Sequence, residues 1–524
     1  MVLDISRQFK LWSSAKRPDW NMKYVISYDL GTGGVKASLV SERGEIVATT
    51  FNPYSTHFTE DNWQEQRPED WWNAIVESTH TLIADRSAEE VNNILSLAIS
   101  GHSLGVVPIG KDGSLLRDKT PIWSDQRAEQ EAADFFERVD YEAWYMQTGC
   151  GFPAPCYSVF KIMWYKNHEP QMFQNIDKVI GTKDYCNYMF TGVLATDPSY
   201  ASGSGVFNLQ EWGYSDEFIA ASFLPREIFP DIIPSDGLVG KITPQAAKLT
   251  GLPEHVEVIC GGVDNSCMAL GAKGNADGRV YTSLGSSAWI ALVAQKPILD
   301  FRYKPYVFAH LIPKMYASAT CIFSAGSSFQ WVRNQLCRDL MEAEKQGGEN
   351  AYVAMGNEAS ESPVGANGVV FNPSLAGGSS IEPTPNISGG FAGLRLQHSR
   401  ADLVRASMEG IALNLKKALD IFKFYYPNIE KMLIVGGGAK SPVWMQMFAD
   451  IYNTDIENTN IDQAAATLGA AALALKGVGV WADYTPLDEV HQTKMVYSPT
   501  QVSKVYEEQV YPRFEKLTEL LAQL

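Results

Sequence analysis

Three glycine-rich turns, each placed at the end of an apolar run, have the composition of phosphate-binding loops. They are Gly31-Thr32-Gly33-Gly34, Gly285-Ser286-Ser287 and Gly436-Gly437-Gly438-Ala439. Glycine carries no side chain, so backbone N–H groups can approach phosphate oxygens closely. A hairpin turn that needs a positive φ is the alternative for any single one of them. Together the three turns indicate phosphate handling.

Two charged residues near the first turn strengthen this interpretation. Asp29 closes the apolar run 24–29, where an unpaired carboxylate costs several kcal/mol unless it binds a cation or a hydrogen-bond donor. Lys36 follows the turn and could pair with the charge of a phosphate. The first turn therefore combines glycine amides with one acidic and one basic group.

Asp264 is a second acidic candidate. The apolar run 256–260 ends beside Gly261 and Gly262 and is followed by Asp264, and ligands of α/β sheets bind at the carboxyl ends of strands. A carboxylate there can accept the proton of a substrate hydroxyl, as phosphoryl transfer to an alcohol requires. The alternative is an aspartate that caps a helix at 265–270. Spacing alone does not separate the two.

The elements that must position these residues follow from the pattern of apolar residues. In the first half, strands are predicted at 24–29, 35–40, 46–51 and 95–101, and helices at 68–85 and 127–137. In the second half, strands are predicted at 279–284, 288–294 and 432–435, with a helix at 441–451 and a terminal helix at 500–524. Ser441 and Pro442 form a strong helix-start signal.

A short repeat predicts the domain organisation. Asp29-Leu-Gly-Thr and Ser283-Leu-Gly-Ser both join one strand to the next, and they begin 254 residues apart, close to half the chain. This spacing predicts two duplicated domains, at 23–273 and 274–484. An extension at 1–22 precedes them, and a helical tail at 485–524 follows.

Length, composition and charge limit the class of protein. A chain of 524 residues suits two or three domains, and 45% hydrophobic residues exclude a mainly disordered chain. The net charge of −17 argues against nucleic-acid and anionic-membrane partners. Seven cysteines without a CxxC pair indicate reduced thiols. With no apolar signal segment near the start, these features predict a cytoplasmic protein.

Several competing motifs are excluded. The segment Gly105–Lys111 resembles a Walker A loop, but Asp112 follows where Ser or Thr should bind Mg²⁺. The third turn lacks the following acidic residue of a dinucleotide-binding fingerprint. The Ala- and Gly-rich segment 464–481 contains Lys476 and is predicted to be a packed interior helix rather than a membrane span.

The order of these segments resembles the FGGY carbohydrate kinases of the actin-like ATPase superfamily. The resemblance covers about 24–480 and rests on the segments 29–36, 63–72, 123–128, 182–185, 201–203, 261–265, 283–287, 324–326, 389–409 and 435–441. It implies an α/β fold of two duplicated ribonuclease-H-like domains with a cleft between them. It also implies an ATP-dependent kinase that phosphorylates a hydroxyl of a small sugar.

The resemblance also assigns roles to individual residues. Asp264 would be the catalytic base, and Asp29 would hold Mg²⁺ through water. The sugar would lie in the first domain and ATP mainly on the second, and a homodimer is implied. With Lys36 included, the predicted ATP-binding residues are Gly31, Thr32, Gly33, Lys36, Gly285, Ser286, Gly326, Gln330, Gly437 and Gly438.

The segment 63–72 looks most like that of the xylulokinases, which implies a ketopentose such as D-xylulose as the substrate. Xylulokinases typically carry Gly-Gln-Met-His-Gly at the sugar-reading turn, whereas this chain has Gly-His-Ser-Leu-Gly at 101–105. His102 and Ser103 would bind sugar hydroxyls together with Asp264 and Asn265. The alternative for His102 is a buried structural side chain.

Alternatives remain for both the substrate and the class of activity. Leu104 stands at the position of the xylulokinase histidine, which leaves other polyols, tetroses and a hydroxylated diketone signal open. The segment 377–383 also departs from the family pattern, so no role is carried over to it. A non-catalytic, actin-like nucleotide switch is the remaining alternative, and the aromatic segments 63–72 and 123–127 favour the kinase.

Overall fold

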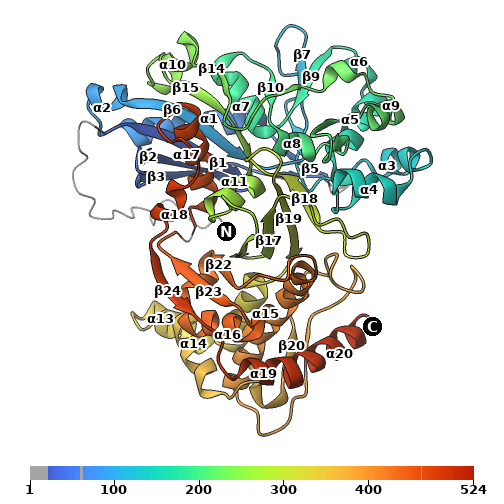
Figure 1. The fold of residues 1–524 in the computed structure, drawn as a ribbon, viewed down its shortest axis with the longest axis vertical. Helices are drawn as coiled ribbons and strands as arrows, with labels where there is room; N and C mark the ends of the chain where they lie inside the picture. The colour runs from blue at the N-terminus through green and yellow to red at the C-terminus, as the bar shows by residue number, and fades with distance from the viewer. Residues whose placement is uncertain (1–21, 60–62, 462) are drawn as a thin grey trace.

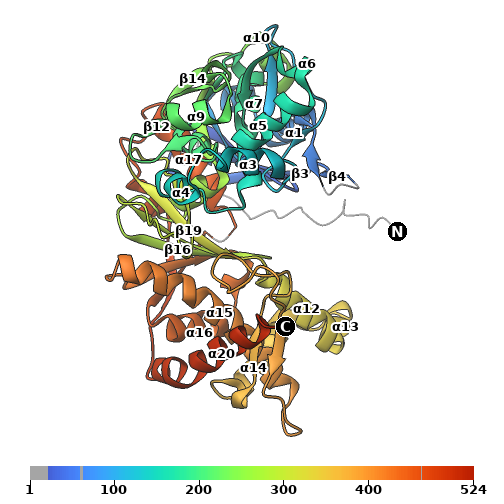
Figure 2. The same cartoon turned by 90° about the vertical axis from the view of Figure 1, so that its right-hand side faces the viewer.

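The computed structural model describes residues 22–59, 63–461 and 463–524. It has two lobes, each built on a mixed β-sheet with helices packed against it (Figure 1). In the view turned by 90°, β16 and β19 lie at the junction of the two lobes (Figure 2). The predicted extension, apart from Met22, lies outside the described residues.

The first sheet has the strand order β14-β15-β6-β1-β2-β3. Its strands are β1 (Tyr24–Gly31), β2 (Gly34–Ser41), β3 (Ile46–Pro53), β6 (Ile94–Gly101), β14 (Leu238–Lys241) and β15 (Glu257–Val263). The three opening strands are antiparallel, as predicted. β6 then pairs parallel with β1, so the carboxyl ends of these two strands lie at the same edge.

The second sheet has the order β18-β19-β17-β16-β22-β23-β24. Its strands are β16 (Arg279–Leu284), β17 (Ala288–Ala294), β18 (Tyr306–Ala309), β19 (Tyr316–Ile322), β22 (Lys431–Val435), β23 (Asp455–Thr459) and β24 (Thr493–Tyr497). Without β18, this sheet repeats the first in strand order and in the direction of every pairing. The repetition confirms two duplicated α/β units.

Helix α1 (Pro68–Ile83) shows how the sequence forms these layers. Pro68 occupies the first turn, where a missing N–H costs nothing, and acidic residues follow it at the positive end of the helix. Trp71, Trp72, Ile75 and Leu82 form one buried face. This face covers β2 and β3.

Further helices complete the two lobes. In the first half they are α3 (Glu129–Phe136), α4 (Tyr141–Thr148), α5 (Ser158–His168), α7 (Thr182–Thr191), α8 (Pro198–Ser202), α9 (Asp216–Ser222) and α10 (Pro244–Thr250). In the second half they are α12 (Gly326–Leu336), α13 (Arg338–Lys345), α14 (Ala351–Glu361), α15 (Arg400–Tyr425) and α16 (Pro442–Tyr452).

Two equivalent helices, one from each half, join the lobes. They are α11 (Asp264–Gly271), which follows β15, and α17 (Ala465–Gly477), which follows β23. Although α17 belongs to the second half, it packs on α11, β1 and β6 (Figure 1). A Cβ at Gly271 would lie 1.8 Å from the Ala465 carbonyl oxygen, and one at Gly469 would lie 2.0 Å from that of Cys267. Glycine therefore permits this close crossing, and the predicted interior helix is confirmed.

The segment 485–524, expected to be a helical tail, also contains the strand β24. It pairs antiparallel with β23 at the edge of the second sheet. The following helix consists of α19 (Ser503–Val505), a π-helical turn (Tyr506–Val510) and α20 (Tyr511–Leu521). Tyr506, Phe514 and Leu517 bury their side chains in the core of the second lobe.

Two further observations concern membrane-spanning helices and disulfide bonds. None of the helices in the described residues is both long and apolar enough to cross a membrane. The seven cysteines, all of which lie in the described part of the chain, form no disulfide bonds. The second observation agrees with the reduced thiols expected from the sequence.

Candidate active site

The first glycine turn joins β1 to β2 and is held by side chains from the first lobe. Thr32 and Gly33 form the exposed tip. Gln66 Nε2 donates a hydrogen bond to the Thr32 carbonyl oxygen at 2.7 Å, and Trp123 Nε1 donates to Thr32 Oγ1 at 3.0 Å. The Tyr54 hydroxyl donates to the carbonyl oxygen of Gly31. Segments far along the chain therefore fix this turn.

The second turn joins β16 to β17 and is held by the start of a helix. The backbone N–H of Gly326, the first residue of α12, donates to the Gly285 carbonyl oxygen at 3.0 Å. The N–H groups of Ala325 and Ser327 donate to the Ser286 carbonyl oxygen at 3.0 and 2.9 Å. A Cβ at Gly326 would lie 2.4 Å from the Gly285 oxygen. Gln330 lies one turn further along α12, exposed.

The third turn follows β22 and packs on the end of β16. The two strands are parallel, so both turns lie at the same edge of the second sheet. Gly436 has φ 101°, and a Cβ at Gly438 would lie 2.3 Å from Leu284 Cδ2. Leu284 immediately precedes the second turn. Packing on this side chain thus brings the second and third turns together.

Each turn also contains at least one glycine that the protein itself does not require. A Cβ at Gly33 would meet no atom within 4 Å. At Gly285 and Gly437 the nearest atoms would be 3.5 and 3.8 Å away, which is ordinary van der Waals contact. None of the three has a positive φ. A turn that needs a left-handed residue therefore does not explain these glycines, and they leave room for a ligand to approach the backbone.

Asp29 lies on β1 just before the first turn. Ser100 Oγ, at the end of β6, donates to Asp29 Oδ1 at 2.8 Å. Burial raises the pKa of Asp29, and the Ser100 hydrogen bond and the charge of Lys36 oppose this effect. Lys36 Nζ donates to the Gln463 carbonyl oxygen at 2.6 Å. Lys36 therefore links β2 to the segment that leads into α17.

Asp264 is the first residue of α11, and the N-cap position belongs to Val263. Asp264 Oδ1 accepts the N–H of Asn265 at 2.8 Å, whereas an N-cap side chain would accept an N–H two or three residues further on. Burial and the charge of Asp29 raise the pKa of Asp264 to about 7. The site thus places two carboxyl groups close enough to interact, one from each end of the first half.

The acidic residues fit a hydrated Mg²⁺. In residues 22–59, 63–461 and 463–524, no three His, Cys, Asp or Glu side chains gather closely enough to hold a metal directly. Mg²⁺ usually keeps several waters and binds one or two carboxylates together with substrate phosphates. Asp29, which lies beside the first turn, has the chemistry for such a contact.

The turn at 101–105, predicted from the sequence to contact the sugar, presents little polar surface. His102 is 2% exposed, contacts Thr182 Oγ1 through Nδ1 at 3.1 Å and packs edge-on against Trp71. Burial, reinforced by the charge of Lys161, lowers the pKa of His102 to about 4, so the ring is neutral at pH 7. Leu104 is buried with φ 61°. These are the features expected of a structural His102, while its contact with substrate stays a prediction.

Two of the predicted sugar-binding residues keep polar groups available. Within the described residues, the Ser103 hydroxyl and the Asn265 side-chain amide make no hydrogen bond to the protein. Ser103 follows His102, and Asn265 follows Asp264 on α11. These two side chains can therefore bind a ligand hydroxyl without first losing a protein partner.

The structure adds residues to which the sequence gave no role. Gln66 and Trp123 hold the first turn, and Arg127 joins the two segments in which they lie. The buried guanidinium of Arg127 bonds both Asp125 and Glu65 at 2.8 Å. The sequence signal for these residues was the pair of segments 63–72 and 123–128. Both contributed to the family resemblance, but neither was given a function.

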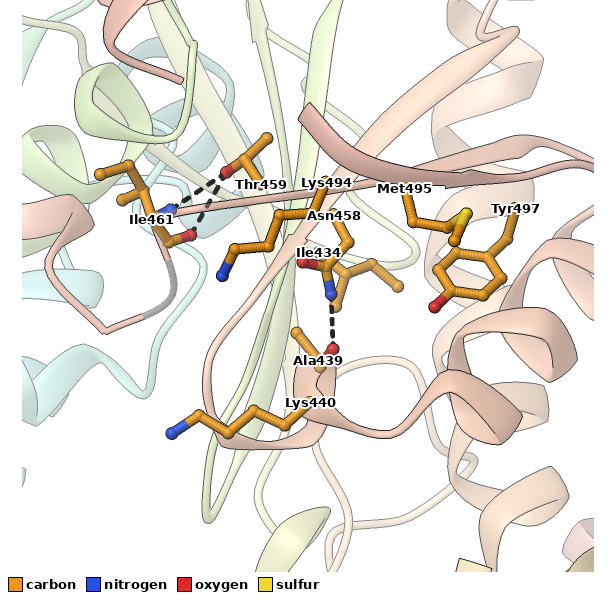
Figure 3. Close-up of a pocket in the computed structure, with 9 residues that line it drawn as sticks. All are labelled: Ile434, Ala439, Lys440, Asn458, Thr459, Ile461, Lys494, Met495 and Tyr497. Carbon is orange, nitrogen blue, oxygen red and sulfur yellow. Dashed lines mark hydrogen bonds between the residues drawn. The ribbon is translucent and has the colours of Figure 1, made fainter. Parts of the chain in front are cut away.

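A cavity of about 300 Å³ adjoins the third turn (Figure 3). Figure 3 shows the ammonium groups of Lys440 and Lys494 extending toward the same side of it. Gly437 and Gly438 are not among its lining residues, which are Ile434, Ala439, Lys440, Asn458, Thr459, Ile461, Lys494, Met495 and Tyr497. The cavity therefore touches the third turn only at Ala439 and does not include the two glycines predicted to bind ATP.

Comparisons with known proteins match both halves of the chain. The models for the N-terminal and C-terminal domains of the FGGY family of carbohydrate kinases match residues 24–271 and 280–478. A xylulose kinase of Bacillus subtilis is 30% identical over 462 residues, which cover 87% of this chain and 89% of the relative. A xylulose kinase of Escherichia coli is 31% identical over 455 residues, 86% of this chain and 89% of that protein. The crystal structure of xylulose kinase from Rhodospirillum rubrum has a TM-score of 0.86 at 27% identity, over 96% of this chain and 99% of that one.

Proposed function

The chain belongs to the FGGY family of carbohydrate kinases, and from this premise we propose that it transfers the γ-phosphate of ATP to a hydroxyl of D-xylulose or a closely related ketopentose. The similarity to xylulose kinases over more than four-fifths of the chain supports this substrate class. The site supports the reaction, because glycine turns and a polarised carboxyl group are what phosphoryl transfer to an alcohol uses.

The observation that carries the proposal is the setting of Asp264. Burial and Asp29 raise its pKa to about 7, close to the working pH at which a general base is most effective. One carboxylate oxygen accepts the adjacent backbone N–H, which leaves the other for the substrate. An aspartate on the surface would be a much weaker base.

The reaction follows from these groups. The substrate hydroxyl gives its proton to Asp264 as its oxygen forms a bond to the γ-phosphorus, and the bond from phosphorus to the bridging oxygen of ADP breaks. The open glycines Gly33, Gly285 and Gly437 let backbone amides approach the phosphates. Asp29 would hold Mg²⁺ through water, and that ion would neutralise developing phosphate charge.

The first lobe would bind the sugar. Among the residues that the structure describes, the Ser103 hydroxyl and the Asn265 side-chain amide have no protein partner, and they flank the base in this scheme. Leu104 stands where xylulokinases typically have histidine, which leaves a polyol, a tetrose or a hydroxylated diketone as the alternative substrate. Movement of the lobes about the α11–α17 crossing would bring phosphate to hydroxyl and exclude water.

The proposal is tested by coupled ADP release from Mg-ATP in the presence of D-xylulose, other ketopentoses, aldopentoses, tetritols, glycerol and hydroxylated diketones. We expect turnover that depends on added sugar and is fastest with D-xylulose. Asp264→Asn should cut kcat by about 10²-fold or more, since a general base contributes about 10²–10⁴-fold, while ATP binding measured by calorimetry is unchanged.

Three results would contradict parts of this proposal. If a tetritol or a diketone is turned over faster than D-xylulose, the proposed substrate is wrong. If the rate of ATP hydrolysis is the same with and without every sugar, a nucleotide switch is favoured. Turnover of Asp264→Asn within a few-fold of the unaltered protein would remove the base. The implied homodimer stays a prediction, which light scattering of the full chain would test.

A further inference from the structure

A β-bulge lies in β15 just before Asp264. The pairing of β15 with β6 shifts between Ile259 and Gly262. Within the bulge, Gly261 has φ 77°, and a Cβ there would lie 2.1 Å from the Ile99 carbonyl oxygen. The equivalent strand of the second half, β23, pairs with β22 without a shift. Bulges next to active sites change the direction in which a side chain points.

Other groups bind the backbone atoms near the bulge. The Cys260 carbonyl oxygen accepts Asn187 Nδ2 at 2.8 Å and Lys183 Nζ at 3.3 Å. The Gly261 N–H donates to the Ser235 carbonyl oxygen at 3.0 Å. The Val263 N–H, directly before Asp264, donates to Ser199 Oγ at 2.9 Å. Buried backbone groups need such partners, so the bulge depends on them.

Asp197 links these partners into one buried network. Its carboxylate accepts hydrogen bonds from the hydroxyls of Ser199 and Ser235, and it lies 3.0 Å from Lys183 Nζ. The Lys183 side chain is 1% exposed and also contacts Asp184. Burial acts against the charged ammonium group, but the two carboxylates outweigh it and raise the pKa of Lys183 well above its usual value.

This network lies beside the strand and not at the reacting groups. Lys183 belongs to α7 and Ser199 to α8, and both helices contact β15. In the described part of the chain, none of its side chains forms a hydrogen bond or an ion pair with Asp264. Its connection to Asp264 runs through the backbone of Cys260 and Val263.

We propose that Lys183, Asp197 and Ser199 are positioning residues that hold the bulge of β15 and so fix the direction of the Asp264 carboxylate. The proposal rests on Asp264 being the base of the proposed function. Lys183 binds the Cys260 carbonyl oxygen at the start of the bulge. Ser199 binds the N–H of Val263, which is the last residue of β15. Asp197 orients both, because it accepts a hydrogen bond from the Ser199 hydroxyl and forms an ion pair with the Lys183 ammonium group.

Ser199→Ala is the sharpest test, because it removes the hydroxyl that accepts the Val263 N–H and leaves the Lys183–Asp197 pair in place. We expect kcat to fall at least 10-fold with KM for ATP unchanged, and the melting temperature to fall only about as far as in a control that loses one buried hydroxyl, because the buried Val263 N–H is left without a partner. Hydrogen–deuterium exchange should increase in peptides that contain Val263. Ser222→Ala is the matched control, because Ser222 has an equally buried hydroxyl, bonded to the Ile219 carbonyl oxygen of α9.

A double-mutant cycle separates positioning from a general structural role. If Ser199 acts through Asp264, its substitution should change kcat less than 2-fold once Asp264→Asn is present. An equal loss in both backgrounds would overturn the proposal, as would a Ser199→Ala kcat equal to that of Ser222→Ala. If Ser199→Ala does not fold, Ser199→Cys, which retains a weak acceptor, takes its place in the same cycle.

The cycle also distinguishes this proposal from the proposed function. A severe loss in Asp264→Asn with an unaffected Ser199→Ala would overturn only the positioning role. Near-normal turnover in Asp264→Asn would overturn the base and, with it, the positioning of that base.

Discussion

The two halves of the molecule share a sheet topology but differ in where they place charge. β1 and β16 occupy equivalent positions, each followed by a glycine turn. Asp29 lies on β1, whereas Ser283 stands at the matching position of β16. Asp264 follows a bulged β15, and the equivalent β23 is regular where it pairs with β22. Duplication thus supplies two equivalent glycine turns, and only the first half adds the two carboxyl groups.

The halves also differ in how each turn is held. The first turn depends on side chains of Tyr54, Gln66 and Trp123. The second is held mainly by backbone N–H groups at the start of α12. The first turn is therefore held by side chains from three separate segments, and the second by backbone groups of a single helix start.

Replacing the carboxylate of Asp29 by a neutral amide should produce the largest difference in kcat between variants of the two halves. Asp29→Asn should lower kcat by about 10²-fold or more, the size expected when a preorganised electrostatic group is lost, and should raise the Mg²⁺ concentration needed for half-maximal rate. Ser283→Ala, at the equivalent position, should change kcat less than 3-fold. Steady-state ADP release with a Mg²⁺ titration measures both, and equal losses would show that the halves do not divide the chemistry in this way.

Substitution of Gly33, at the tip of the first turn, should have a smaller effect that is confined to KM for ATP. Gly33→Ala places a methyl group where the protein has no atom within 4 Å, so the melting temperature should not change. KM for ATP should rise about 10-fold because the methyl group blocks close approach of phosphate, with KM for the sugar unaffected.

Gly213→Ala is the control for this variant, since a Cβ there also meets nothing within 4 Å and lies away from the turns, in the short strand β12 (Gly213–Tyr214). If Gly33→Ala binds ATP as well as Gly213→Ala does, the open glycine is not a phosphate contact.

Much of the scaffold could be predicted from the sequence because it follows local patterns. The hairpins around Gly31 and Gly285 alternate short apolar runs with glycine turns, and their spacing predicted the duplication. The start of α16 was marked by Ser441 and Pro442, and Ser441 Oγ does accept the N–H of Trp444. These signals lie within a few residues of the structure that they specify.

Other features depend on contacts between distant segments and could not be predicted. The bulge at Gly261 needs partners from 183–199 and 235, which no local pattern connects to β15. The helix α17 is buried from Ala465 to Leu475 on every side, so its sequence has no polar face to show which sheet it covers. β24 has mostly exposed residues, and the neighbouring helical pattern obscured it.

The smallest expected difference is in KM for ATP, between variants that remove one side-chain hydrogen bond from the first turn or from the second turn. Trp123→Phe removes the indole N–H that bonds Thr32 Oγ1, and one such hydrogen bond contributes about 1 kcal/mol. Because Trp123 is partly exposed, water can replace part of the lost bond, and we expect KM for ATP to rise about 2- to 5-fold. Ser327→Ala removes the side-chain hydrogen bond to the Ser286 carbonyl oxygen. The N–H groups of Ala325 and Ser327 still bond that oxygen, so the change should stay below 2-fold. A larger effect for Ser327→Ala than for Trp123→Phe would show that the first turn does not depend more on side-chain hydrogen bonds than the second.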